Sequence, residues 1–133
     1  MKPFKLKIVT PKGIYKETDI EMLNLKTTAG QIGILANHIP LASAIEISEM
    51  NYIENGERKP FAISGGFVYV SEDETTIIAN AIESPEEIDI RRAQEAKERA
   101  EGRLKTAPSD IDIMRAEIAL RRAINRIHVK NGG

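Results

Sequence analysis

The sequence predicts an α+β protein in which an N-terminal antiparallel β-sandwich is followed by a C-terminal antiparallel two-helix hairpin. From Phe4 to about Asn80, short runs rich in β-branched and aromatic residues alternate with turn residues, without a helical period between them. Past Ala81 the apolar residues recur at helical spacing. Two similar hexapeptides, IDIRRA at 88–93 and IDIMRA at 111–116, indicate a paired helical element. We therefore expect two domains, residues 1–84 and residues 85–133.

The first domain contains several short runs that are typical of strands. These runs are FKLKIV, EMLNLKT, KPFAIS, FVYVS and TTIIAN, and they are separated by PKG, TAGQIG, ENGE and SEDE. Close spacing of strands without intervening helices favours an antiparallel sandwich or barrel. Asn55-Gly56 is the clearest hairpin signal, because both residues tolerate positive φ. The glycines of Ser64-Gly65-Gly66 predict a bulge or a close approach of two strands, since the spacing of a nucleophile elbow is missing.

The segment SPEE predicts the start of the first helix. Ser84 is a suitable N-cap, Pro85 fits the first helical position, and Glu87 completes a capping box three residues after the cap. We expect this helix to end at Gly102, which is a suitable residue just past a helix C-terminus.

Ser109 and Asp112 predict the start of a second helix, as N-cap and third helical residue, which should run from about Asp110 to His128. The link between the two helices is short. Helices joined in this way fold back on one another, so we expect an antiparallel hairpin.

The repeat extends beyond the hexapeptide, because nine of the sixteen positions from Ile88 to Arg103 recur 23 residues later. At about 100° per residue the repeated alanines form one stripe on each helix. These alanines are Ala93, Ala96 and Ala100, followed by Ala116, Ala119 and Ala123. Two copies are too few for a solenoid. The simplest interpretation is therefore two matching seams along which the helices approach closely.

The repeated arginines allow a second interpretation. Asp89 precedes Arg92 by three residues, as Asp112 precedes Arg115, and such intrahelical ion pairs contribute only a few tenths of a kcal/mol. If the helices pack, however, Arg92 comes near arginines of the second helix, and like charges are costly unless an anion lies between them. Planar guanidinium groups suit phosphate. The residues alone leave both interpretations open.

Composition excludes several classes of protein. The 133 residues, 41% hydrophobic, suffice for a modest core. The lack of cysteine excludes disulfides and is consistent with a cytoplasmic protein, and no apolar run approaches the roughly 20 residues that would cross a bilayer. A net charge of −1, with no aromatic residue in the predicted helices, argues against nucleic-acid binding. Two histidines and no paired-carboxylate motif predict neither a metal site nor an enzyme.

Three motifs resemble a known family. GQIGILANHIPL at 30–41, AISGGFVYV at 62–70 and the two-helix tail beginning IDIRRA are together similar to the epsilon subunit of bacterial F-type ATP synthase, over essentially the whole chain. The resemblance implies a non-catalytic rotor-stalk subunit. Its sandwich would couple the gamma subunit to the c ring, and its mobile hairpin would regulate ATP hydrolysis by extending toward the catalytic beta and alpha subunits.

The same resemblance implies where the partners lie. The loop with Gln31 and His38 would face the c-ring subunits, and the basic C-terminal helices would meet an acidic segment of the beta subunit. The protein would then be peripheral, on the cytoplasmic face of the cell membrane. Ala36-Asn37 stands where many members have Pro-Gly, and we expect Asn37 to adopt the left-handed conformation that glycine provides there.

In members from Bacillus-like bacteria the hairpin binds ATP as a regulatory ligand, alone or with magnesium, and Ile88, Asp89, Arg92 and Ala93 match the motif of that group. The resemblance implies further nucleotide contacts at Glu83, Arg99, Arg122 and Arg126. Arg92, Arg122 and Arg126 would hold phosphates, and Glu83 and Asp89 the adenine or ribose. Arg103 is left out of this site, because the first helix is expected to end before it.

A rival hypothesis is a purely structural stalk subunit whose hairpin stays folded and senses no nucleotide. In that case the arginines serve only solubility and docking.

Overall fold

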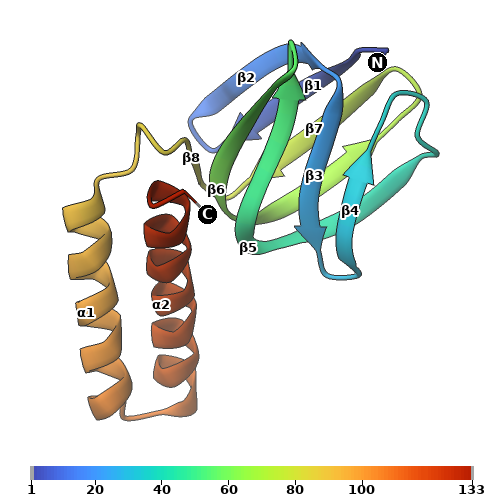
Figure 1. Cartoon of the computed structure of the whole chain (residues 1–133). Helices are drawn as coiled ribbons and strands as arrows, with labels where there is room; N and C mark the ends of the chain where they lie inside the picture. The colour runs from blue at the N-terminus through green and yellow to red at the C-terminus, as the bar shows by residue number, and fades with distance from the viewer. Residues whose placement is uncertain (1, 133) are drawn as a thin grey trace. The chain divides into compact units, whose positions relative to one another are not determined.

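The computed structural model describes residues 2–132, and the chain divides into two compact units, one ending at Glu83 and the other beginning at Ser84. The first unit contains the strands and the second contains the helices (Figure 1). The strands are β1 (Phe4–Thr10), β2 (Gly13–Ile20), β3 (Met22–Thr27), β4 (Gly30–Ile34), β5 (Leu41–Glu54), β6 (Glu57–Val70), β7 (Glu74–Ala79) and β8 (Ile82–Glu83). The helices are α1 (Ile90–Thr106) and α2 (Asp110–Lys130).

The strands form one continuous sheet in the order β2-β1-β7-β6-β5-β3-β4, and β8 pairs with β6. Every neighbouring pair is antiparallel except β1 and β7, which are parallel. The sheet curls around a single apolar core, as expected for the predicted sandwich. The largest of its fully buried side chains are Tyr52, Leu6, Ile8, Ile20, Leu23, Leu25, Ile34 and Met50.

The turn between β5 and β6 confirms the predicted hairpin. Asn55 and Gly56 have φ values of 52° and 79°, as a two-residue turn that matches the strand twist requires. Two contacts connect this hairpin to β2 and to the residue that follows it. Thr18 of β2 donates a hydrogen bond to the Glu54 carboxylate, and the Gly56 N–H donates to Glu21 Oε1 at 3.1 Å. These contacts bring the β2 edge of the sheet close to the long strand β5.

Gly66 confirms the predicted close approach of strands. Its φ is 147°, and a Cβ atom at this position would lie 2.1 Å from the carbonyl oxygen of Ile78 in the neighbouring strand β7. Only glycine fits a contact this close, because any side chain would push the two strands apart.

One stretch that was predicted to lie between two strands is itself part of a strand. Gly30 and Gln31 were expected in a turn, but they begin β4, which pairs with β3 from Thr27 opposite Gly30 to Leu23 opposite Ile34. The actual turn covers only Thr28 and Ala29, and it is held by the Thr27 hydroxyl, which donates to Gly30 O at 2.9 Å. The positive φ of 119° at Gly30 allows the chain to leave this tight turn directly into the strand.

The two helices form the predicted antiparallel hairpin, drawn in orange and red in Figure 1. Helix α2 begins after Ser109, whose hydroxyl accepts a hydrogen bond from the Asp112 N–H at 3.2 Å, so the predicted cap is confirmed. The helix ends at Lys130, two residues later than expected. Among residues 2–132, no helix has the length and apolar character needed to cross a membrane.

The predicted end of α1 is wrong. The helix continues through Gly102 to Thr106, and Ala107 is its C-cap. Ala107 has an extended conformation, with φ −62° and ψ 124°, because the following Pro108 disfavours the helical region for the residue before it. A single glycine costs a helix only about 1 kcal/mol relative to alanine, so it does not by itself end one.

Candidate functional site

The candidate site begins with a separate turn that precedes α1. The predicted capping box forms here, because the Ser84 N–H donates to Glu87 Oε1 at 2.9 Å and the Glu87 N–H donates to Ser84 Oγ at 3.3 Å. However, the turn ends at Ile88, and the helix itself starts only at Ile90. The predicted helix start at Pro85 is therefore wrong by five residues.

Asp89 is the reason for this second start. Its backbone is extended, with φ −86° and ψ 106°, and its carboxylate accepts a hydrogen bond from the Arg92 N–H at 3.1 Å, as an N-cap residue does. The other carboxylate oxygen, Oδ2, lies 3.8 Å from Arg92 Nε. Asp89 therefore caps α1 and lies beside the Arg92 side chain, so the first of the two expected intrahelical pairs is confirmed. The second expectation is wrong, because Asp112 and Arg115 do not pair: the Asp112 carboxylate accepts from the Ser109 hydroxyl instead.

The end of α2 lies beside this turn. Lys130 Nζ donates a hydrogen bond to the carbonyl oxygen of Pro85 at 2.8 Å. This contact fixes the register of the hairpin and defines its open end, where α1 starts and α2 finishes. Lys130 was not among the residues predicted for the site, because its partner Pro85 lies 45 positions away in the sequence and the contact has no local signature.

The alanine seams are present as predicted. Ala93, Ala100, Ala116 and Ala123 are all at most 2% exposed, and Ala96 and Ala119 are half-buried. Small side chains at these positions let the two backbones lie close together. The interpretation of the repeat as two matching seams is thus confirmed, although it does not account for the arginines.

The other residues predicted for the site divide into two groups. Ile88 is buried, whereas Arg92, Arg99 and Arg122 are exposed and Arg126 is half-buried. Arg126 lies one helical turn before Lys130 and Arg122 lies two turns before it, so both are near the open end. Arg99 lies about two turns along α1 from Arg92, further from the open end.

Glu83 differs from the other predicted site residues in its location. It is the last residue of β8, half-buried and paired with Ala62 of β6, so it belongs to the first unit rather than to the hairpin. Asp89, Arg92, Arg122 and Arg126 all belong to the unit that forms the hairpin, the first two at the start of α1 and the last two in α2.

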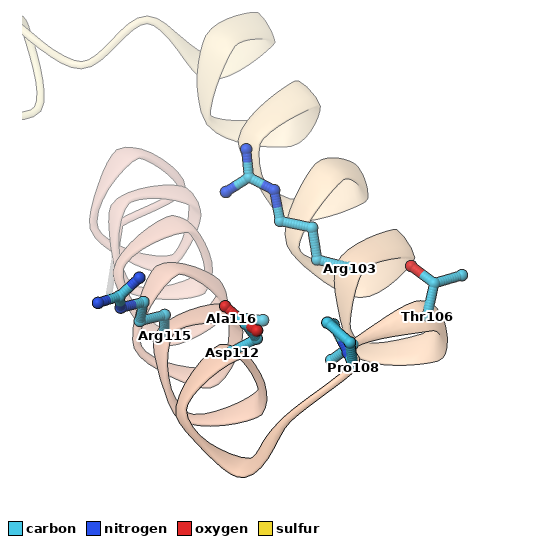
Figure 2. A pocket seen from close by; sticks show the side chains of 7 residues that line it. Arg103, Thr106, Pro108, Asp112, Arg115 and Ala116 are labelled. Atoms are coloured by element: carbon cyan, nitrogen blue, oxygen red, sulfur yellow. The ribbon is translucent and has the colours of Figure 1, made fainter.

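A pocket of about 320 Å³ lies at the opposite end of the hairpin, where α1 turns into α2. Figure 2 shows Arg103 reaching from α1 and Arg115 from α2, with Pro108 in the turn between them. We call it the turn pocket, and its lining includes Arg103, Thr106, Pro108, Asp112, Arg115 and Ala116. The reason for leaving Arg103 out of the candidate residues was wrong, because α1 does not end at Gly102.

The two residues predicted to face the c ring lie along one edge of the sheet. β4 is the edge strand, with Gln31 near its start and His38 in the turn that follows its end. The turn is held by the His38 N–H, which donates to Leu35 O at 3.2 Å, and by a hydrogen bond between His38 Nδ1 and Ile39 O at 2.7 Å. Asn37 has a φ of 65°, so the predicted left-handed conformation is confirmed.

Comparisons with known proteins match both units. Residues 3–85 match the model of the ATP synthase delta/epsilon chain β-sandwich domain, and residues 86–131 match that of its long α-helix domain. The chain is 47% identical over 131 residues to the ATP synthase epsilon chain of Bacillus thuringiensis, covering 98% of each chain. It is 46% identical over 132 residues to the epsilon chain of Ruminococcus albus, again covering 98% of each.

A solved structure shows the same fold. A chain in the mitochondrial ATP synthase of Euglena gracilis, in a structure of its OSCP, F1 and c-ring, superimposes with a TM-score of 0.80 at 23% identity. The match covers 92% of this chain and 78% of the other.

Proposed function

Because the chain belongs to the delta/epsilon chain family of ATP synthase, we propose that it is a non-catalytic subunit of the central stalk that regulates ATP hydrolysis through an ATP-sensitive hairpin. The observation that carries the regulatory part is the open end of the hairpin. There, Arg92 of α1 lies beside Asp89, the cap of α1, and Arg126 and Arg122 lie one and two turns before Lys130, whose side chain contacts Pro85.

Phosphate is the ligand chemistry that suits this end. Guanidinium groups bind phosphate oxygens through paired hydrogen bonds, and a polyanion between the two helices offsets the repulsion among the arginines. The side chain of Arg92 is 82% exposed, and its contact with Asp89 at 3.8 Å is a surface pair. Such pairs contribute about 1 kcal/mol or less, so Arg92 exchanges its partner for a phosphate at little cost.

The location of the arginines on both helices explains how a ligand acts as a switch. ATP held from α1 and α2 together stabilises the folded hairpin relative to any pose in which the helices separate, and the population shifts by the difference in affinity. At low ATP the hairpin is released, extends toward the catalytic beta and alpha subunits, and inhibits hydrolysis. Its exposed arginines would meet an acidic surface there.

The sandwich supplies the docking surface to the rest of the rotor. We assign the edge of β4 and its following turn, from Gln31 to His38, to the c-ring subunits, and the sandwich as a whole to the gamma subunit. Leu35 and Ile39 on this edge are 47% and 75% exposed, which is typical of a surface that a partner covers. The protein would thus be peripheral, at the cytoplasmic face of the membrane, as part of the complex.

Calorimetric titration of the full chain with ATP, ADP and GTP tests the proposed nucleotide site. We expect binding that favours ATP and weakens about tenfold or more in Arg92→Gln and in Arg126→Gln, since each variant loses a charge-assisted contact. Arg91→Gln is the matched control, because Arg91 is the neighbouring exposed arginine and pairs with Glu95 at 3.3 Å. No binding at millimolar ATP, or an equal loss in the control, would refute the proposal.

Limited proteolysis separates the switch from the purely structural subunit. The link between the helices runs from Ala107 to Ser109, and its exposed residues Pro108 and Ser109 make it a site at which a protease would cut. We expect ATP to slow this cleavage if it clamps the hairpin. Cleavage at the same rate with and without saturating ATP would favour the structural subunit.

A further inference from the structure

The repeat and the antiparallel hairpin together create two similar ends. A shift of 23 residues carries the buried Ala93 and Ala100 of α1 onto the buried Ala116 and Ala123 of α2. Ala100 lies seven residues before Ala107 and Ala116 lies seven after Ser109, so these two alanines are level in the hairpin. The same spacing, doubled, places Ala93 level with Ala123. The helices are therefore related by an approximate two-fold axis between them.

This axis pairs the start of each copy of the repeat with the end of the other copy. At the open end, Arg92 from the start of the first copy lies near Arg126 from the end of the second. At the turn, Arg115 from the start of the second copy and Arg103 from the end of the first both line the turn pocket. Asp112 and Ala116, the equivalents of Asp89 and Ala93, also line this pocket.

We propose that the turn pocket is a second ligand site, which binds a phosphorylated compound carrying hydroxyl groups, such as a sugar phosphate. This goes beyond the proposed function, which concerns only the open end. The phosphate lies between the guanidinium groups of Arg103 and Arg115. The hydroxyl groups of the ligand donate hydrogen bonds to the Asp112 carboxylate.

The side chains in the turn pocket are available for a ligand. Within residues 2–132, neither Arg103 nor Arg115 has a carboxylate within 4.0 Å or a hydrogen bond through its guanidinium. The Asp112 carboxylate accepts a hydrogen bond from the Ser109 hydroxyl at 2.7 Å, which fixes its position and leaves it further acceptor capacity. Two unpaired cations and one oriented acceptor suit a phosphate with a neighbouring hydroxyl.

The two ends differ in a way that determines what each recognises. Ile88 at the open end is 3% exposed, whereas its equivalent Ile111 is 62% exposed. The difference arises because Ile88 precedes its helix, while Ile111 lies within the first turn of α2. Ile111 is also not among the residues that line the turn pocket, which has no large apolar side chain to pack against a base. We expect it to recognise the sugar and phosphate and to show no preference among bases.

Nuclear magnetic resonance of the full ¹⁵N-labelled chain tests the inference, with ribose 5-phosphate and ATP as probes. We expect ribose 5-phosphate to give saturable amide shifts at residues 103–116. Its affinity should fall about tenfold in Arg103→Gln and in Arg115→Gln, because each loses a charge-assisted contact to phosphate. Arg121→Gln is the matched control, an exposed arginine of α2 outside the pocket lining.

The outcomes distinguish the two ends of the hairpin. ATP shifts confined to residues 88–93 and 122–126, with no saturable shift at 103–116 for either probe, overturn this inference and leave the proposed function intact. Shifts at 103–116 alone, removed by Arg115→Gln and kept in Arg92→Gln, support the inference and contradict the nucleotide site at the open end. Shifts that do not saturate, or that weaken equally in Arg121→Gln, also overturn it, since they report only general charge screening.

Discussion

Replacing Gly102 with alanine should stabilise the hairpin. Gly102 lies inside α1, is exposed, and a Cβ atom at this position would meet nothing within 4 Å. Alanine is favoured over glycine in a helix interior by about 0.8–1 kcal/mol, and no clash reduces this gain. Gly102→Ala should therefore make the local opening of α1 less favourable by nearly the whole propensity difference.

Amide hydrogen exchange of the full chain measures this effect. A change of about 1 kcal/mol slows exchange through local opening by about fivefold, and we expect this for amides from Glu98 to Thr106. Gly33→Ala is a suitable contrast, because its Cβ would lie 3.0 Å from Met22 Cε and 3.3 Å from Asn24 Oδ1. That variant should leave exchange in α1 unchanged and speed it in β3 and β4.

Faster exchange in α1 of Gly102→Ala would refute the reasoning. It would mean that α1 is bent or opened at Gly102 in solution, so that an added methyl group interferes with the native backbone. Unchanged exchange would also count against the reasoning, because the structure shows no contact that would offset the difference in helix propensity between alanine and glycine.

Three further variants test the sandwich. Gly66→Ala should cost more than about 3 kcal/mol in urea unfolding, because its Cβ would lie 2.1 Å from a carbonyl oxygen of β7; a loss below 1 kcal/mol would contradict this. Tyr52→Phe should be neutral or stabilising by about 1 kcal/mol, because the buried Tyr52 hydroxyl has no hydrogen-bond partner among the described residues. Burial also raises the pKa of Tyr52. Hydrogen bonds from Thr18 and Lys59 lower the pKa of Glu54 below its ordinary value of 4.5. The ionised Glu54 carboxylate therefore stabilises the folded state above pH 4.5, and this stabilisation is lost as the pH falls through the folded-state pKa. The urea midpoint of Glu54→Gln should be lower than that of the parent at neutral pH and should converge on it in acid; a difference independent of pH would contradict the assignment.

Local signals predicted the helices better than their ends. Ser84 and Ser109 both cap turns as expected, but Asp89 also has the chemistry of a cap, and the sequence does not decide between two caps five residues apart. The structure places Ile88 between them in a buried position, which requires the chain to change direction there. Burial of this kind depends on packing and is not visible in a capping motif.

In the sheet, too, contacts between segments far apart in the sequence could not be predicted. The turn at Asn55-Gly56 and the close approach at Gly66 were predictable because each depends on local backbone conformation. The parallel pairing of β1 with β7 was not predicted, since it joins residues about 70 positions apart in the sequence and has no local signature. Gly30 suggested a turn, because glycine is common in turns. In the structure it is the first residue of β4, directly after a two-residue turn, where its positive φ is also needed.

The candidate site was predictable where the repeat marks it. The alanine seams follow directly from helical spacing, and Arg92 follows from the first copy of the motif, whereas Arg122 and Arg126 were predicted from the family resemblance. The turn pocket was missed for one reason, the assumption that α1 ends at Gly102. The shift of 23 residues, which carries Asp89 and Arg92 onto Asp112 and Arg115, was a signal that could have found it.

The hydrogen bond from Lys130 to Pro85 has a practical consequence for work on this protein. It makes the last turn of α2 part of the structure that holds the start of α1, although Lys130 lies only three residues from the end of the sequence. A bulky label on a side chain of this last turn would therefore lie beside the start of α1, where the nucleotide site is proposed.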